Sequence, residues 1–147
     1  MYQRILIATD GSALSRKAVI SGIKLAEHLG AQVVALKVVP RYPVSYFEGG
    51  LSVATKEVAR LEQLWAEDAL AVVEAVKTTA EAAGVKAKAV TTSSDLVAES
   101  IIATATKHKC DLIAMASHGH RGLKSLLLGS ETMHVLTHSH IPVLVLR

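Results

Sequence analysis

The stretch Ala116 to Ser130 reads A-S-H-G-H-R-G-L-K-S-L-L-L-G-S and joins two segments of different periodicity. The continuous apolar run Leu112–Met115 precedes it and predicts a strand, whereas the periodic segment Thr132–His138 follows it and predicts a helix. A strand, a glycine-bearing loop and a helix N-terminus together make a site for an anion. Glycine lets the backbone approach a phosphate, and the free N–H groups of the helix point at it.

Side chains within this stretch add to the same interpretation. Ser130 stands where an N-cap hydroxyl is expected, and Gly129 frees the turn before it. Arg121 and Lys124 contribute positive charge. The same residues also fit an ordinary strand-to-helix connection with basic surface residues, so the loop alone leaves both interpretations open.

Length and composition favour one folded domain spanning residues 1–147. Half of the 147 residues are hydrophobic, which is enough for a buried core. Only five residues are Phe, Trp or Tyr, so Ala, Val, Leu and Ile must fill that core. The net charge of +3 is scattered, and no basic stripe with interleaved aromatic residues supports nucleic-acid binding.

The cysteine count and the hydropathy pattern bear on the compartment. Cys110 is the single cysteine, which excludes an internal disulfide and suits a reducing cytoplasm. Because it precedes an apolar run, a packed structural thiol is expected rather than a nucleophile. No apolar run reaches the roughly 18 residues of a membrane span. The N-terminus has no apolar stretch of signal-peptide length, and a cytoplasmic protein is therefore expected.

Strand-like and helix-like patterns alternate along the whole chain. The expected strands are Arg4–Thr9, Val33–Val39, Lys86–Thr92, Cys110–Ala116 and Val143–Leu146. The expected helices run from Ser12 or Ser15 to about Leu29, from about Ser52 to Ala83, from a cap at Ser93, Ser94 or Asp95 to about His108, and from Ser130 to about His138. This alternation predicts an α/β fold, a doubly wound five-stranded parallel sheet with helices on both faces, Rossmann-like.

Apolar spacing within the helices predicts their buried faces. The first helix carries a stripe of Val19, Ile23, Ala26 and Leu29, and the long helix carries one of Leu61, Trp65, Ala69, Val72, Val76, Ala80 and Ala83. Lysine alternates with apolar residues over Lys86–Val90, which is typical of a half-exposed edge strand. The loop Arg41–Gly50 holds three aromatic residues, and they are expected to anchor it.

In a doubly wound sheet, ligands bind beyond the carboxyl ends of the strands, where the winding direction reverses. If the first and fourth strands flank that reversal, Thr9 and Asp10 meet the segment Ala116–Gly119 in one crevice. Two chemically suggestive loops from distant parts of the chain then form one site.

Three motifs resemble those of the universal stress protein family in their order and spacing, and the resemblance covers essentially the whole chain. They are I-L-I-A-T-D-G-S at Ile5–Ser12, P-V-L-V at Pro142–Val145, and the loop between them. The ATP-binding subgroup of that family has glycine, two residues, glycine, nine residues, glycine, then serine or threonine. Gly119, Gly129 and Ser130 match that pattern here, while Ala116 stands at the first glycine.

The resemblance implies a strand order of 3-2-1-4-5 and an adenine-nucleotide site. Its cofactor-binding residues are Ala8, Thr9, Asp10, Val38, Met115, Ala116, His118, Gly119, Arg121, Gly129, Ser130, Glu131 and Thr132. The expected ligand is ATP, or AMP or ADP, with Mg²⁺ held mainly by the phosphates. Asp10 is expected to accept hydrogen bonds from ribose hydroxyls or to cap the first helix, and both roles stay open.

Two positions of the site differ from a simple phosphate loop. Ala116 adds a methyl group, which matters only if its φ is positive, and a strand-end residue is expected to have negative φ. Glu131 places a carboxylate in the first turn of the last helix, which favours the helix dipole but repels a phosphate. Arg121 and Lys124 are expected to offset that charge.

The resemblance also implies a homodimer through the closing strand Val143–Leu146, which lies at a sheet edge in that strand order. An uncovered apolar edge invites pairing with a second chain, and coverage by a loop of the same chain is the alternative. A dimeric nucleotide-binding module of the stress response is the leading interpretation. A dimerising interaction protein without nucleotide and a slow ATPase are the alternatives.

Other chemistries find less support in the sequence. His134 and His138 share a helix face and His140 follows, but no carboxylate or cysteine lies at zinc-ligand spacing, so surface or interface histidines are expected. No catalytic triad spacing occurs, and the lysine of a P-loop is missing. A receiver domain is excluded because Val90–Thr92 holds no aspartate at the end of the third strand.

Overall fold

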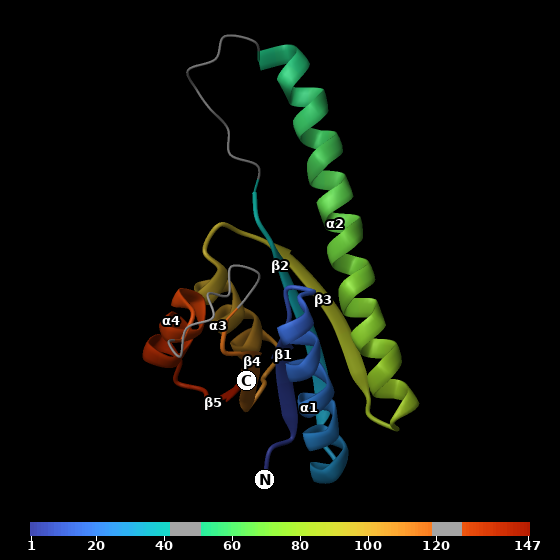
Figure 1. The fold of residues 1–147 in the computed structure, drawn as a ribbon, viewed down its shortest axis with the longest axis vertical. Helices are drawn as coiled ribbons and strands as arrows, with labels where there is room; N and C mark the ends of the chain where they lie inside the picture. Colours follow the sequence, from blue (N-terminus) through green and yellow to red (C-terminus); the bar gives the residue numbers. More distant parts are fainter. Residues whose placement is uncertain (42–50, 119–127) are drawn as a thin grey trace.

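Five parallel strands alternate with four helices in the computed structural model (Figure 1). The structure describes residues 1–41, 51–118 and 128–147. The strands are β1 (Arg4–Ala8), β2 (Gln32–Val39), β3 (Ala87–Ser93), β4 (Leu112–Ala116) and β5 (Val143–Leu146). The helices are α1 (Ala13–Leu29), α2 (Leu51–Ala82), α3 (Val97–Lys107) and α4 (Ser130–His138). The loop with the aromatic residues lies outside the described residues, except for Arg41.

The sheet has the order β3-β2-β1-β4-β5, which confirms the predicted doubly wound arrangement. β1 lies at the centre, where Leu6 pairs with Val34 of β2 on one side and with Ile113 of β4 on the other. The winding direction therefore reverses between β1 and β4. The carboxyl ends of these two strands flank the place where a ligand binds in such sheets.

The two faces of the sheet carry separate hydrophobic cores. Ile5 and Ile7 of β1 face α1 and α2, whereas Leu6 and Ala8 face α3 and α4. Ile5, Leu6 and Ile7 have no exposed surface, and burial of each such side chain contributes about 1.5–3 kcal/mol. Because both faces are covered, the strands read as continuous apolar runs in the sequence.

Helix α1 has the boundaries that its sequence predicts. Ser12 is its N-cap and accepts a hydrogen bond from the Ser15 backbone N–H, and Gly30 ends it with φ 65°. The prediction that Leu29 is a core residue is wrong, because Leu29 is 38% exposed. Leu25 packs against the core instead.

Helix α2 is much longer than the strands it covers. Its 32 residues span about 48 Å, and its N-terminal part extends past the sheet (Figure 1). Ala69, Val76 and Ala80 of the predicted stripe are buried, together with Val73. The remaining members that were expected in the core, Leu61, Trp65, Val72 and Ala83, are only half-buried.

The predicted caps of α3 and α4 are wrong. α3 begins after Leu96, which gives no side-chain cap, while Ser94 Oγ accepts from the Leu96 N–H and Asp95 accepts from the backbone of Arg41. α4 begins after Gly129, so Ser130 is its first helical residue and not its N-cap. Glycine also serves as an N-cap, because it adopts the extended conformation that this position needs.

Candidate functional site

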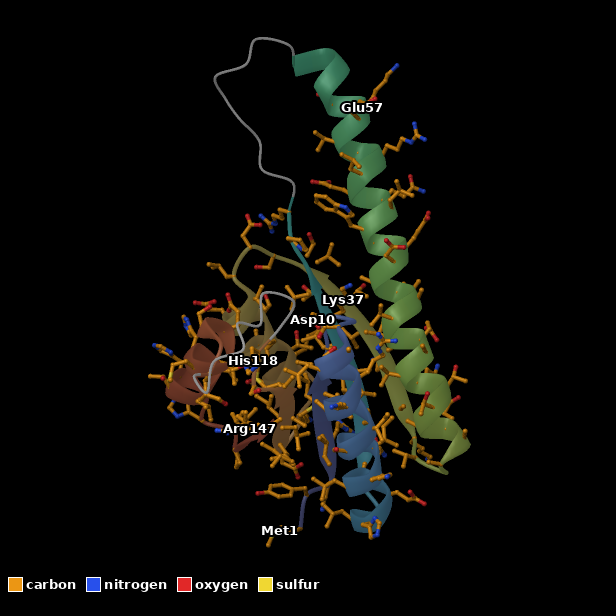
Figure 2. All side chains as sticks on the ribbon, viewed as in Figure 1. Met1, Asp10, Lys37, Glu57, His118 and Arg147 are labelled. Atoms are coloured by element: carbon orange, nitrogen blue, oxygen red, sulfur yellow. The ribbon has the colours of Figure 1, made fainter. Side chains whose placement is uncertain are left out.

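A pocket of about 150 Å³ opens at the carboxyl edge of the sheet, between β1 and β4. Nine residues that the sequence predicted line it: Ala8, Thr9, Asp10, Val38, Met115, Ala116, His118, Glu131 and Thr132. Asp10 and His118 are labelled in Figure 2 and approach this edge from the ends of β1 and β4. The structure therefore brings the two distant loops together, as the reversal of the sheet predicted.

One side of the pocket is an apolar slot. Leu36 and Val38 of β2, Met115 of β4, and Val97 and Ile101 of α3 line it. The volume of the whole pocket is below the roughly 300–1,000 Å³ of a pocket that encloses a drug-sized ligand, so part of a larger ligand would lie outside it.

The turn after β1 is held by its own hydroxyl groups. Ser15 Oγ donates to Ser12 O at 2.9 Å, so the Thr9 hydroxyl donates to Ser15 Oγ at 3.0 Å. Thr9 Oγ1 also accepts from the Gly11 N–H at 3.2 Å, and Gly11 has φ 81°. Asp10 Oδ1 accepts from the Ser12 N–H at 2.9 Å. These bonds fix Asp10 at the mouth of the pocket before any ligand arrives.

The end of β4 meets the start of α4 just as closely. The Gly129 N–H donates to Ser117 O at 2.8 Å, and Thr132 Oγ1 donates to Ala116 O at 2.9 Å. A Cβ on Gly129 would lie 3.2 Å from the Cα of His118, a contact that requires one of the two segments to shift. Glycine at this position therefore lets the two segments approach, so the N-terminus of α4 reaches the pocket.

Ala116 lies in β4 and is 8% exposed. Among the described residues, Lys109 is the only one other than glycine with a positive φ. The expected negative φ of Ala116 is therefore confirmed. Its methyl group causes no backbone strain at the site.

The carboxylate of Glu131 is directed to α3. Its Oε2 accepts a hydrogen bond from the Ala98 backbone N–H at 3.1 Å. It thus serves the first turn of α3, where Leu96 offers no cap. The positive end of that helix dipole stabilises the negative charge and reduces its effect on an anion at α4.

His118 carries an unusual atom. Of the buried side-chain nitrogen and oxygen atoms that the structure describes, only His118 Nδ1 has no hydrogen-bond partner. Leaving such a group unpaired costs about 1–3 kcal/mol. His118 lines the pocket, although Nδ1 itself has almost no exposed surface, so a ligand reaches this nitrogen only when the ring turns.

Four predicted site residues lie elsewhere. Gly129 and Ser130 stand at the start of α4, next to the lining residue Glu131, and do not line the pocket. Gly119 and Arg121 lie outside the described residues, as does Lys124. The sequence reasoning missed Ser15, Leu36, Val97 and Ile101. Leu36 could have been found from Val38, because residues two apart on a strand face the same side.

The Universal stress protein family model matches residues 1–147. The chain belongs to the universal stress protein family. It is 35% identical to universal stress protein MJ0531 of Methanocaldococcus jannaschii, over 100% of this chain and 83% of that protein. The solved structure of MJ0577 from the same organism has a TM-score of 0.80 and 29% identity, covering 99% of this chain and 96% of that one.

A third universal stress protein, solved in complex with cAMP, shares the fold. Its TM-score is 0.68 at 22% identity, with 99% of this chain and 97% of that chain covered. At this identity the likeness shows the fold alone. In the described part of this universal stress protein, no helix combines the length and apolar character that crossing a membrane requires.

His134, His138 and Cys110 of this universal stress protein do not line the pocket. His134 Nε2 is 3.2 Å from Glu99 Oε1, and its ring stacks against His138 with centroids 4.2 Å apart. Within the described ranges no three His, Cys, Asp or Glu side chains gather as metal ligands. Burial raises the pKa of the Cys110 thiol to about 11, as expected of a packed structural thiol.

Proposed function

We propose that this chain is a universal stress protein that binds an adenine nucleotide, ATP in the first place, and acts as a dimer in the cytoplasm. The observation that carries the nucleotide is a single pocket whose lining combines apolar residues of β2, β4 and α3 with Asp10 after β1 and the first turn of α4. These three parts of the lining suit the base, the sugar and the phosphates of a nucleotide.

The adenine ring enters the apolar slot between β2 and α3. Val38 and Ile101 offer it flat apolar contact. Asp10, held by the Ser12 N–H, accepts hydrogen bonds from the ribose hydroxyls. His118 bonds to the ribose or to the first phosphate once its ring turns Nδ1 into the pocket.

The phosphates lie at the N-terminus of α4. The first turn of any helix has N–H groups without partners inside the helix, and the macrodipole there favours negative charge. Gly129 brings this turn to within reach of the end of β4. Mg²⁺ is held mainly by the phosphates, and Arg121 and Lys124 add positive charge. The cAMP complex of a protein with this fold supports an adenine ligand.

Binding in this pocket couples to α3 and α4, because both helices line it. The hydrogen bond from Ala98 to Glu131 joins them directly. Nucleotide occupancy therefore biases the surface that these helices present to other proteins. This is how a binding module without hydrolysis serves a stress response.

Calorimetric titration with ATP and Mg²⁺ tests the proposal. We expect measurable heat and a rise in the melting temperature for the natural chain. Val38→Phe should abolish both by filling the slot. Val90→Phe is the matched control, because Val90 is half-buried against the same core but does not line the pocket.

No heat and no thermal shift at millimolar ATP would reject nucleotide binding. A dimer that persists under those conditions would favour the interaction protein without nucleotide. Phosphate release above the blank that Val38→Phe removes would identify the slow ATPase.

A further inference from the structure

A second hollow lies at the opposite edge of the sheet, where the strands begin. Its volume is about 230 Å³. Met1 and Asp10, labelled in Figure 2, lie at opposite ends of β1 and show where the strands begin and where they end. Arg4, Gln32, Lys86, Lys88 and His108 supply its polar lining.

The charge of this hollow has one sign. Arg4, Lys86 and Lys88 line it, and among the described residues no Asp or Glu does. Lys107 and Lys109 are exposed on either side of His108 in the chain. A hollow lined by charges of one sign concentrates the field and raises the local concentration of counter-ions.

Two carboxylates of this region, those of Asp111 and Glu27, do not line the hollow. Asp111 accepts hydrogen bonds from the backbone N–H groups of Gln3 and Arg4, at 2.8 and 3.0 Å. Glu27 lines a neighbouring hollow together with Lys86. Neither carboxylate lines the hollow itself, so an excess of positive charge remains there.

Arg4 holds the hollow in shape. Its Nη1 donates to His108 O at 2.6 Å and its Nη2 donates to Gln32 Oε1 at 3.2 Å. It thereby ties the end of α3 to β1 and β2. The guanidinium is positioned before any ligand binds, and the mobile cations around it are lysines.

The same positive charges affect the pKa of His108. Burial is the largest cause that lowers the pKa of His108, and the positive charges of Lys88, Lys107 and Arg4 lower this pKa further. No carboxylate raises it. The lowered pKa favours the neutral imidazole, which makes His108 a hydrogen-bonding group among cations.

The backbone at Lys109 is an independent observation. Lys109 has φ 56°, in the left-handed region, where residues other than glycine pay about 1 kcal/mol. The same region follows α1 and α2, where this chain uses Gly30 and Gly84. Lysine at this third helix end therefore costs stability that glycine would not, and it adds a positive charge one residue after His108.

We propose that this hollow, with the lysines beside it, binds a compact anion of linked phosphoryl groups. Lysine ammonium groups are flexible point charges rather than rigid forks, so they suit dense charge spread over several oxygens more than a single carboxylate. Arg4 donates hydrogen bonds to His108 and Gln32, and its remaining N–H groups can donate to the anion. The site is separate from the nucleotide pocket and does not depend on it.

The experiment is a titration of the ¹⁵N-labelled full chain with inorganic tripolyphosphate at low ionic strength. We expect amide shifts at residues 86–88 and 107–109 that saturate, and an affinity that falls steeply with added salt. Shifts confined to residues 8–10 and 129–132 would overturn the proposal. That outcome would report on the nucleotide pocket, so the two sites are distinguished in one spectrum.

Variants give the second arm. Lys88→Gln with Lys107→Gln should weaken tripolyphosphate binding about tenfold, from the loss of two exposed charge contacts. The matched control is Lys17→Gln with Lys24→Gln, which removes the same charge from exposed positions on α1. An equal loss in the control pair would overturn the site, because net charge alone would then explain binding.

Lys109→Gly separates charge from backbone strain. It should raise the melting temperature, as glycine tolerates the left-handed region, and should weaken tripolyphosphate binding. Unchanged binding would overturn the role of Lys109. Tighter binding of a single-stranded oligonucleotide than of tripolyphosphate would replace the small anion with a nucleic acid and overturn the proposal.

Discussion

At the scale of the residue, His118 is the sharpest feature of the pocket. Its Nδ1 is buried without a partner, so the folded chain gains nothing from that atom. We expect His118→Phe to leave the unfolding free energy unchanged or slightly raised while ATP affinity falls about threefold to tenfold, the effect of one hydrogen bond. Calorimetry and urea unfolding measure the two quantities. Equal losses in both would show that His118 is structural.

Asp111 makes a second prediction at the same scale, in the pH dependence of stability. Partial burial raises its pKa, but the backbone N–H groups of Gln3 and Arg4 more than offset this and bring the pKa below its ordinary 3.8. A lowered folded pKa stabilises above the unfolded pKa, and this stabilisation is lost as pH falls through the folded pKa. Asp111→Ala should therefore cost about 1–2 kcal/mol at pH 7, and less as the pH falls below the ordinary pKa of 3.8.

Urea unfolding of the natural chain and of Asp111→Ala at pH 7 and at low pH measures that difference. Asp68→Ala is the control, since Asp68 is an exposed aspartate on α2 with no hydrogen bond to β1. A gap between the natural chain and Asp111→Ala that stays constant with pH would contradict the prediction.

At the scale of the element, α1 packs on β1 through a glycine. A Cβ on Gly22 would lie 2.8 Å from Ile7 Cδ1 and 3.1 Å from Ile7 Cγ1. Ile7 is fully buried, so its side chain has little room to move. We expect Gly22→Ala to cost about 1–3 kcal/mol from overpacking, despite the better helix propensity of alanine. Gly22→Ala with Ile7→Val should recover part of the loss in thermal unfolding, and no recovery would place the cost elsewhere.

Elements and the caps of α1 were predictable because their signal is local, whereas the N-caps of α3 and α4 were not. The strands follow from apolar runs, and Gly30 ends α1 where the pattern stops. The cap of α3 could not be found, because Glu131 lies 33 residues from Ala98 in the chain. Serine favours the N-cap position, which predicts Ser130 as the cap of α4. The cap is Gly129 instead, whose backbone is extended and lies close against His118.

At the scale of the whole molecule, topology explains which site the sequence could reveal. The pocket was predictable because parallel strands bring Thr9 and Ala116 to the same edge wherever the winding reverses. The hollow at the other edge was not, since Arg4, Lys88 and His108 come from three separate segments with no shared spacing. A sequence motif identifies a site only when one continuous segment supplies most of the residues of that site.

The edge strand β5 carries the last prediction, the homodimer. Its side chains are all half-buried, and it pairs with β4 on one side. Pro142 O and Leu146 O accept hydrogen bonds from β4, so the alternate residues Val143 and Val145 direct their backbone groups away from it. Those outward groups are what a second copy of β5 would pair with.

Val145→Pro removes one outward N–H without removing a bond to β4, since proline is tolerated on an edge strand at such a position. We expect the natural chain to sediment as a dimer at micromolar concentration and Val145→Pro to sediment as a folded monomer. Val145→Thr keeps both the N–H and the branched shape and should stay dimeric. A natural chain that is monomeric at that concentration, or a Val145→Pro variant that remains a dimer, would show that β5 is not the interface.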